Sequence, residues 1–512
     1  MTTLHHLLLV LSFVGFSNII IAQKPNVIVI YTDDHRYTGV HALGGQDVKT
    51  PAMDGLVENG VSFSNAYLMG AFHGATCAPS RAMLHTGRNL FELQGQGFSI
   101  PEEHKTLGET LRKEGYYSHI IGKWHQDKES LVRSFNSGSK IMGIGLYLVD
   151  HFRMPLWEFD RDPSQLEPEN AFLLKYDKLK NITKVPFDKA MKKGPIANED
   201  EGPHTSEVFA TEAAKFLKEY KKDAPFFMYL AFHAPHDPRQ APQKYRDMYP
   251  AKEIQLTPSY LPVHPFDNGD MTLRDEALAP WPRTEMITKQ QLADYYAIIT
   301  HLDDQIAKVI AALKASGKYE NTVIVFAGDS GLAVGNHGLM GKQNLYNEDG
   351  IHIPLVFSGG AIKQKGIKTD ALTYNFDIYP TICDMLKIQT PSSVSGKSLL
   401  PIINKTKTVN REHQYFAYKQ FQRAYRKGDY KLIEYVKAKT LDKESGEVVR
   451  GSRVTQLYNI KTDPWEVNNL AFMEENLSLV KTLQIEMQKE AKKLGDYMTI
   501  REGEQYSFWD FY

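Results

Sequence analysis

Acidic side chains end two of the apolar runs of this chain. The run "PNVIVIYTDD" ends with Asp33 and Asp34, and "NTVIVFAGDSG" ends around Asp329 and Ser330. Carboxylate oxygens are the ligands that hard cations prefer, so these residues predict a calcium or magnesium site rather than a zinc site. Asp-Asp pairs commonly cap turns, but their place at the end of a buried strand favours a metal site here.

A cysteine precedes a helix signal in the stretch "CAPSRAMLHTGR". Pro79 suits the first turn of a helix, so Cys77 is expected at or near a helix N-terminus. Negative charge is stabilised there, which lowers the pKa of a thiol and favours a nucleophile. A buried structural cysteine is the alternative, and the residues alone leave both open.

Two further apolar runs end in groups that bind anions or transfer protons. The run "GYYSHIIGKWH" ends with Lys123 and His125, and "APFFMYLAFHAPH" contains His233 and His236. In a parallel sheet, functional groups collect just beyond the carboxyl ends of the strands. Because four runs share this feature, we expect one convergent site.

The elements that must position these groups alternate between strand and helix. Continuous runs rich in Val, Ile and Tyr indicate strands buried on both faces. Strands alternating with helices predict an α/β fold with a large, mostly parallel central sheet flanked by helices. The strands are expected over 25–34, 115–125, 224–236 and 321–331, and two of the helices over 106–115 and 293–317.

The chain also contains less regular segments and a distinct C-terminal part. Residues 137–205 and 237–290 have weak periodicity and are expected to be long functional loops. After about residue 410, short alternating aromatic runs predict an antiparallel sheet, and residues 475–494 predict an amphipathic helix. We therefore expect a large domain over 23–409 and a smaller α+β subdomain over 410–512.

The net charge and the number of cysteines exclude several classes of protein. A formal net charge of −1 over 512 residues provides no general attraction to nucleic acid or to an anionic membrane. Two cysteines, Cys77 and Cys383, cannot build a disulfide framework or a four-cysteine zinc site. Residues 1–22 are typical of a signal peptide cleaved after Ala22, with a buried first helix as the alternative. We expect export to the periplasm or beyond, without stable membrane insertion.

Several motifs together resemble one family. The string "CAPSR" at residues 77–81 resembles the C-x-P-S-R signature of the type I, formylglycine-dependent sulfatases of the alkaline phosphatase-like superfamily, and "TGR" fits its extension. "PNVIVIYTDD", "GKWH", "HAPHDP" and "GDSGLAVGNHGLMGKQNLYNEDG" resemble the other blocks of the family in the same order, and "LYNIKTDPWEVNNLA" its C-terminal motif. The resemblance implies that residues 23–409 form the catalytic domain of a sulfuric ester hydrolase.

The resemblance also implies a modified nucleophile. A formylglycine-generating or anaerobic sulfatase-maturating enzyme would convert Cys77 to Cα-formylglycine. One hydroxyl of the hydrated aldehyde would attack sulfur, and the alcohol would leave. The second hydroxyl would then lose a proton, so that the aldehyde reforms and sulfate is expelled. One calcium ion would be bound by oxygen ligands, with residue 77 close to it: Asp33, Asp34, modified Cys77, Asp329 and Ser330.

Further roles follow from the same resemblance. Arg81 would hold the oxygen of the nucleophile, and Lys123 and Lys342 would bind sulfate oxygens and stabilise charge in the transition state. His125 would be the base of the elimination step, and His236 would protonate the leaving oxygen.

Ser330 departs from the family pattern, which usually has Asn or His at this position. A hydroxyl is a weaker ligand than an amide, so the fourth protein ligand and the metal affinity are in doubt.

The expected substrate is a sulfated mono-, oligo- or polysaccharide, selected by the loops 137–205 and 237–290. Candidate substrate contacts outside the motifs are His151, Arg153 and His337, and His73 is a candidate to line the pocket.

Two alternatives stay open. The first is a phosphodiesterase or phosphonate hydrolase of the same superfold, although a zinc-dependent relative would place more histidines in the metal site. The second is a sulfatase-like glycan-binding protein with weakened catalysis, which only Ser330 supports.

Overall fold

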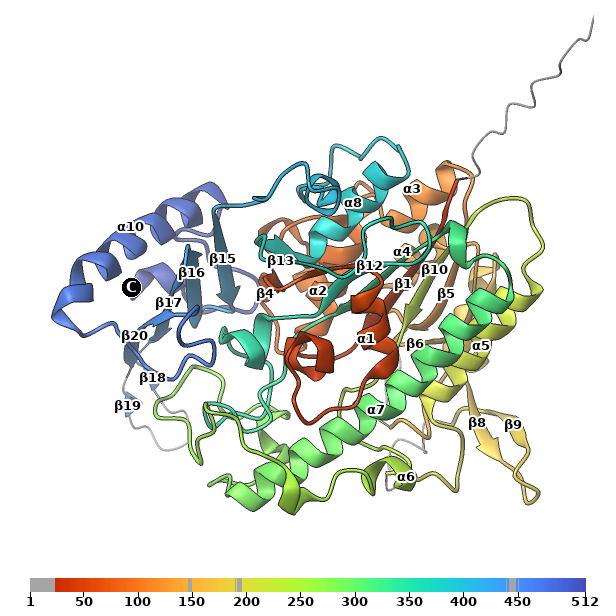
Figure 1. Cartoon of the computed structure of the whole chain (residues 1–512). Coiled ribbons are helices and arrows are strands. Elements are labelled where there is room, and N and C mark those ends of the chain that lie inside the picture. Colours follow the sequence, from red (N-terminus) through yellow and green to blue (C-terminus); the bar gives the residue numbers. More distant parts are fainter. Residues whose placement is uncertain are drawn as a thin grey trace, which may run out of the picture.

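The structure is a computed structural model that describes residues 24–145, 150–188, 190, 196–438, 440–441, 448–449 and 451–512 (Figure 1). The expected signal peptide lies outside these ranges and stays a prediction. Among the residues that the structure describes, no helix combines the length and apolar character that a membrane span requires.

A nine-stranded sheet is the centre of the described part of the chain, in the order β13-β2-β12-β11-β1-β10-β5-β6-β7. The run from β11 to β6 is parallel throughout, whereas β12 and β7 are antiparallel to their neighbours. The strands are β1 (Asn26–Thr32), β2 (Val61–Phe63), β5 (Tyr117–Lys123), β6 (Ser137–Met142), β7 (Trp157–Asp160), β10 (Phe226–Ala231), β11 (Thr322–Gly328), β12 (Leu355–Ser358) and β13 (Ile367–Thr369).

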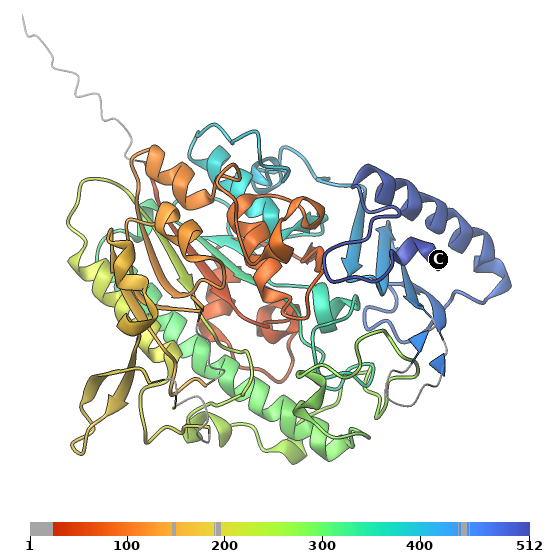
Figure 2. The ribbon, with the colours of Figure 1, turned by 180° about the vertical axis from the view of Figure 1, so that it is seen from behind.

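Helices cover both faces of this sheet, as Figures 1 and 2 show from opposite sides. Alternate residues of β1 enter two separate cores: Ile28 and Ile30 pack with α1, α5 and α7, and Val27 and Val29 pack with α2, α3 and α8. The helices are α1 (Pro51–Glu58), α2 (Cys77–Thr86), α3 (Leu107–Lys113), α4 (Lys128–Ser134), α5 (Thr205–Glu219), α6 (Gln243–Arg246), α7 (Glu285–Ala315), α8 (Ile378–Met385), α9 (Leu400–Ile403) and α10 (Leu477–Lys493).

The four expected strands are confirmed, and all four are parallel neighbours. The interpretation of residues 137–205 as a loop insertion was wrong. This segment supplies β6 and β7 to the central sheet, and it also forms the hairpin of β8 (Phe172–Tyr176) and β9 (Ile182–Pro186). The strand β6, "SGSKIM", has few β-branched residues, so its main-chain pairing with β5 decides its conformation more than its composition does.

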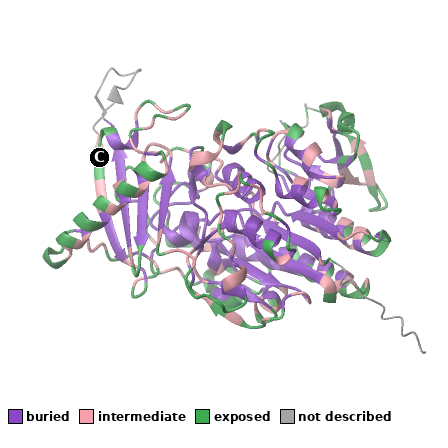
Figure 3. Ribbon diagram, turned by 90° about the horizontal axis from the view of Figure 1, so that it is seen from above, coloured by how far each residue is buried: buried purple, intermediate pink, exposed green. Residues whose placement is uncertain are grey.

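A second, five-stranded sheet forms the C-terminal part, in the order β20-β17-β16-β15-β4, with α10 packed on it. Its strands from this part are β15 (His413–Tyr418), β16 (Gln422–Lys427), β17 (Tyr430–Lys437) and β20 (Ser452–Asn459). Short pairs join β3 (Ala66–Tyr67) to β14 (Thr373–Tyr374) and β18 (Thr440–Leu441) to β19 (Val448–Val449). Figure 3 shows that buried residues fill the strands of both large sheets.

The strand β4 (Gly70–Ala71) comes from the N-terminal part of the chain but pairs with β15 of the C-terminal sheet. Gly70 has φ +118°, and a Cβ there would lie 1.9 Å from the carbonyl oxygen of Ala417, so the close approach of these strands requires glycine. Because β4 lies just before Cys77, the C-terminal sheet anchors the segment that leads into α2.

Candidate active site

The ends of the four central strands bring the predicted groups together. Asp33 and Asp34 follow β1, Asp329 and Ser330 follow β11, and Lys123 is the last residue of β5. All five side chains are fully buried. Because these strands run parallel, their carboxyl ends meet at one edge, as expected.

The three carboxylates form a compact cluster with unused ligand atoms. The Asp34 amide donates to Asp329 Oδ1 at 2.8 Å, and Ser330 Oγ donates to Asp34 Oδ1 at 3.1 Å. Asp33 Oδ1 and Asp34 Oδ2 are buried without a hydrogen-bond partner among the described residues. Ligand atoms of Asp33, Cys77 and Asp329 lie within 4.8 Å of one another. Buried carboxylate oxygens without partners are costly, and a cation would satisfy them.

The electrostatics of the cluster support the same interpretation. Burial raises the pKa of Asp34 to about 6, although the positive charge of Lys342 opposes the shift. Burial and the negative charge of Asp33 together raise the pKa of Asp329 to about 8. Burial acts in the same direction on Asp33, but Lys123 and His236 hold its pKa well below the usual value. Three crowded carboxylates therefore resist full ionisation, and a bound cation would relieve their repulsion.

Three basic side chains contact the same carboxylates. Lys123 Nζ pairs with Asp33, and Lys342 Nζ pairs with Asp34. Arg81 Nη2 donates to Asp329 Oδ2 at 2.8 Å, while its Nη1 donates to the carbonyl oxygen of Lys123. Three basic side chains face three carboxylates, so a divalent cation added to this cluster would give the site a net positive charge suited to an anionic substrate.

Cys77 is the first residue of α2, at the predicted helix start, and is buried. Its Sγ lies 3.4 Å from His125 Nδ1 and 3.7 Å from Lys123 Nζ. Burial raises the pKa of the Cys77 thiol to about 11, although Lys123 and Lys342 oppose the shift. The expectation of a lowered pKa was therefore wrong, because desolvation outweighs the helix N-terminus and both lysines. The unmodified thiol is protonated at neutral pH.

Two neutral histidines flank the thiol and the carboxylates. Burial, and then the charge of Lys123, lowers the pKa of His125 well below its usual value; burial and Lys342 do the same for His236. The Nδ1 of His236 donates to the Asp237 carbonyl oxygen at 2.7 Å, which leaves Nε2 facing Asp34 Oδ2 at 3.8 Å. His125 has φ +69°, a left-handed backbone that is unusual for a non-glycine residue and found at functional sites.

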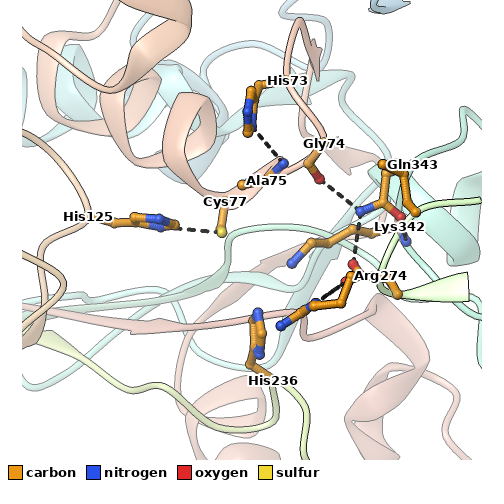
Figure 4. Close-up of a pocket in the computed structure, with 11 residues that line it drawn as sticks. His73, Gly74, Ala75, Cys77, His125, His236, Arg274, Lys342 and Gln343 are labelled. Atoms are coloured by element: carbon orange, nitrogen blue, oxygen red, sulfur yellow. Dashed lines mark hydrogen bonds and ion pairs between the residues drawn. The ribbon is translucent and has the colours of Figure 1, made fainter. Parts of the chain in front are cut away.

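A cavity of about 290 Å³ opens beside Cys77 (Figure 4). Five lining residues were named from the sequence: His73, Cys77, His125, His236 and Lys342. Four further side chains were missed: Leu273, Arg274, Asp275 and Gln343. Three of these belong to the segment 237–290, whose composition predicted a functional loop but not which of its residues reach the cavity.

The three candidate substrate contacts are not among the residues that line this cavity. His151 is fully buried, and its Nε2 donates to the carbonyl oxygen of His236 at 2.9 Å, so it supports His236 from behind. Arg153 pairs with Asp150 at 3.3 Å. His337 stacks on Tyr346 with ring centroids 3.7 Å apart, and its Nδ1 pairs with Asp349. The complete burial of His151 corrects the expectation that it touches a sugar directly, whereas substrate contact by Arg153 and His337 stays a prediction.

The position of His151 leads to a testable expectation. We expect His151→Phe, which keeps the ring packing on His204 and His233, to lower kcat by about 5-fold with little change in KM, because the lost hydrogen bond to His236 is worth ~1 kcal/mol. The bond from His151 Nδ1 to Thr205 is lost as well, which lowers stability. Steady-state kinetics would measure this. His301→Phe is the matched control, since His301 packs on His204 and its Nε2 pairs with Glu207. Equal losses in both variants would assign the effect to packing alone.

Comparison with known proteins decides the family. Residues 25–388 match the family model described as Sulfatase. The chain belongs to the sulfatase family. A second model, described as N-sulphoglucosamine sulphohydrolase, C-terminal, matches residues 335–493 and includes most of the C-terminal sheet. As a sulfatase, the protein is a sulfuric ester hydrolase of the alkaline phosphatase-like superfamily, which confirms the resemblance in the sequence.

Curated relatives of this sulfatase cover nearly all of its length. An ulvan-active sulfatase of Formosa agariphila is 26% identical, over 94% of this chain and 83% of its own. An N-acetylglucosamine-6-O-sulfatase of Bacteroides thetaiotaomicron is 25% identical, over 93% of this chain and 87% of its own.

Solved structures confirm the fold of the sulfatase. A protein in complex with its substrate D-glucosamine-2-N,6-O-disulfate superimposes with a TM-score of 0.69 at 20% identity, covering 93% of this chain and 99% of its own. The phosphonate monoester hydrolase of Agrobacterium radiobacter also reaches 0.69, at 19% identity, covering 94% of this chain and 99% of its own. At these identities the likeness shows the fold alone.

Proposed function

We propose that this sulfatase hydrolyses sulfate esters of a carbohydrate, using a formylglycine made from Cys77 and one bound calcium ion. The observation that carries the proposal is the neighbourhood of Cys77: its sulfur lies among the buried carboxylates, lysines and neutral histidines at the strand ends. A thiol with a pKa of about 11 is a poor nucleophile at neutral pH, which favours a modified side chain over a thiolate.

The residues present fit a calcium ion. Asp33, Asp34 and Asp329 would hold it with the modified residue 77, since Asp33 Oδ1 and Asp34 Oδ2 are buried carboxylate oxygens that have no hydrogen-bond partner in the described part of the chain. Ser330 Oγ adds one neutral oxygen beside them. An all-oxygen set favours calcium over zinc. When bound, the ion would act as a Lewis acid that offsets the charge of the sulfate group.

The surrounding side chains suit the steps of sulfate transfer. Cys77 Sγ marks the place of the oxygen of the modified side chain, and His125 Nδ1, 3.4 Å away and neutral, is suited to accept its proton. Lys123 and Lys342 would bind sulfate oxygens. Arg81 would act by holding Asp329 and, more weakly, Asp33 in the cluster, because these are the carboxylates that its guanidinium contacts.

His236 is the candidate donor to the leaving oxygen. Its Nδ1 proton is used by the Asp237 carbonyl, so Nε2 donates only when the ring is an imidazolium. Burial keeps the ring neutral in the free protein. An anionic ester bound beside it would raise its pKa and favour the protonated form at the moment of reaction.

The substrate class rests on the relatives, which are named for ulvan and for N-acetylglucosamine 6-sulfate. The test is sulfate release, measured by ion chromatography, from a panel of defined sulfated mono- and oligosaccharides beside an aryl sulfate, a phosphodiester and a phosphonate monoester. We expect the highest kcat/KM on a sulfated saccharide. Turnover of phosphorus esters alone would contradict the proposal and favour the phosphonate hydrolase alternative.

A further inference from the structure

Lys342, one of the two lysines assigned to the sulfate oxygens, lies in an irregular segment of the chain. The segment runs from the end of β11 to the turn Asn347–Ile351. The side chain of Lys342 is buried, and its Nζ pairs with Asp34 of the carboxylate cluster. Because an irregular segment lacks the hydrogen-bond ladder of a helix or strand, other contacts must hold this lysine in place.

A buried glutamate holds the two residues that precede Lys342. The Oε1 of Glu276 accepts from the backbone amide of Gly341 at 2.9 Å and from that of Met340 at 3.2 Å. Its Oε2 accepts from the Met340 amide at 3.1 Å. Hydrogen bonds to a carboxylate are stronger than those between neutral groups. One side chain therefore fixes the peptide groups that lead into Lys342.

The residue after Lys342 is fixed as well. Gln343 Oε1 accepts from the Lys342 amide at 3.0 Å. Its Nε2 donates to Asp275 Oδ2 and to the carbonyl oxygen of Gly74, each at 2.8 Å (Figure 4). Gly74 lies three residues before Cys77, so these bonds also tie Lys342 to the segment that carries the nucleophile.

Glu276 has a countercharge of its own and lies outside the cavity lining. Arg283 Nη2 pairs with Glu276 Oε2 and also donates to the backbone carbonyl oxygen of Glu276 at 3.0 Å. Burial raises the pKa of the Glu276 carboxyl, so keeping this group inside the protein is costly unless it is paired. In the described structure, Glu276 is not among the residues that line the cavity beside Cys77. Its route to the reaction is therefore the backbone of Lys342.

We propose that Glu276 is a positioning residue that fixes Lys342 for binding the sulfate ester. The role deepens the proposed function and rests on it, because it acts through a lysine assigned to the sulfate oxygens. Loss of the amide contacts would let the backbone of Lys342 shift, and a displacement of about 1 Å in an active site costs up to about 100-fold in rate. Glu276 belongs to the segment 237–290, which thus contributes to catalysis without touching the substrate at this residue.

A double-mutant cycle tests the role of Glu276. Glu276→Gln removes the charge and turns an N–H group toward either Arg283 or the amides of residues 340 and 341, so one set of bonds is lost. We expect it to lower kcat/KM by about 10- to 100-fold in the wild-type background. In a Lys342→Ala background the same change should cost less than about 2-fold, because the lysine through which Glu276 acts is gone. Equal losses in the two backgrounds would overturn the proposal.

Asp303→Asn is the matched control for loss of stability. Asp303 is also a buried carboxylate that accepts from two consecutive amides, those of Ala52 and Met53 at the start of α1. Thermal unfolding should show a lower Tm for both single variants, whereas kcat/KM well below the Tm should fall only in Glu276→Gln. A similar fall in Asp303→Asn would assign the effect to general destabilisation and refute the positioning role.

The cycle is run on the ester of the panel that the wild-type protein hydrolyses fastest. Failure of the proposed function would appear as turnover of phosphorus esters alone. Failure of the positioning role would appear as equal losses in the two backgrounds, whichever ester is used, so the two failures are distinguishable.

Discussion

Replacing Cys77 by alanine is expected to lower sulfate release by about 10⁴- to 10⁶-fold, as the loss of a nucleophile does in other hydrolases. Sγ occupies the point where His125, Lys123 and the carboxylate cluster converge, so no other side chain in the described structure can replace it. Cys383→Ala is the matched control: that thiol lies on α8 and is buried in the core outside this cluster, and its loss should cost only ~1 kcal/mol of stability.

Two measurements at residue 77 distinguish a modified side chain from a thiolate nucleophile. In the active wild-type protein, mass spectrometry of the peptide containing residue 77 should show an aldehyde in place of the thiol group. A thiol with a pKa of about 11 is only ~10⁻⁴ ionised at pH 7, and this fraction rises tenfold with each pH unit. Full activity with unmodified Cys77, or a rate that climbs in this way toward pH 11, would refute the formylglycine proposal.

Removal of calcium is expected to have the second largest effect. Chelation should lower kcat/KM by about 10³-fold, and calcium should restore it, because a Lewis acid stabilises the transition state by several kcal/mol and each 1.36 kcal/mol is a factor of ten. Thermal unfolding provides a readout besides activity: calcium at 100 times its Kd should stabilise the folded protein by about 2.7 kcal/mol.

Variants of the cluster refine this expectation. Asp329→Asn should weaken calcium binding strongly, because it removes a charge from the cluster and one partner of Arg81. Ser330→Ala should weaken it less, since the Ser330 hydroxyl is neutral and donates its proton to Asp34. Calorimetric titration of both variants would measure the order. Restoration of full activity by zinc but not by calcium would contradict the assignment of the metal.

Much of the site could be predicted from local sequence. Asp33, Lys123, His236 and Asp329 each lie at or just after the end of an apolar run, and parallel pairing of the runs places their ends at one edge. The start of α2 at Cys77 followed from Pro79 two residues later. The β-branched composition of these runs and the fixed φ of proline are local properties, so no knowledge of distant contacts was needed.

Other features depended on contacts between distant segments. The pairing of β4 with β15 and the strand β6 have little local signal, because main-chain bonds to remote partners define them. Likewise, the sequence suggested that His151 would touch a sugar, but His151 is buried and its Nε2 donates to the carbonyl oxygen of His236.

The sequence by itself determined which chemical groups the protein has, the strands that deliver them, and the family to which they point. Only the tertiary structure decided how those groups behave. Desolvation, which depends on every neighbour, raises the pKa of Cys77 against the helix N-terminus and two lysines. The loop that contains Arg274 and Asp275 reaches the cavity because Asp237 and Gln343 hold it there through hydrogen bonds. No local sequence pattern encodes these contacts.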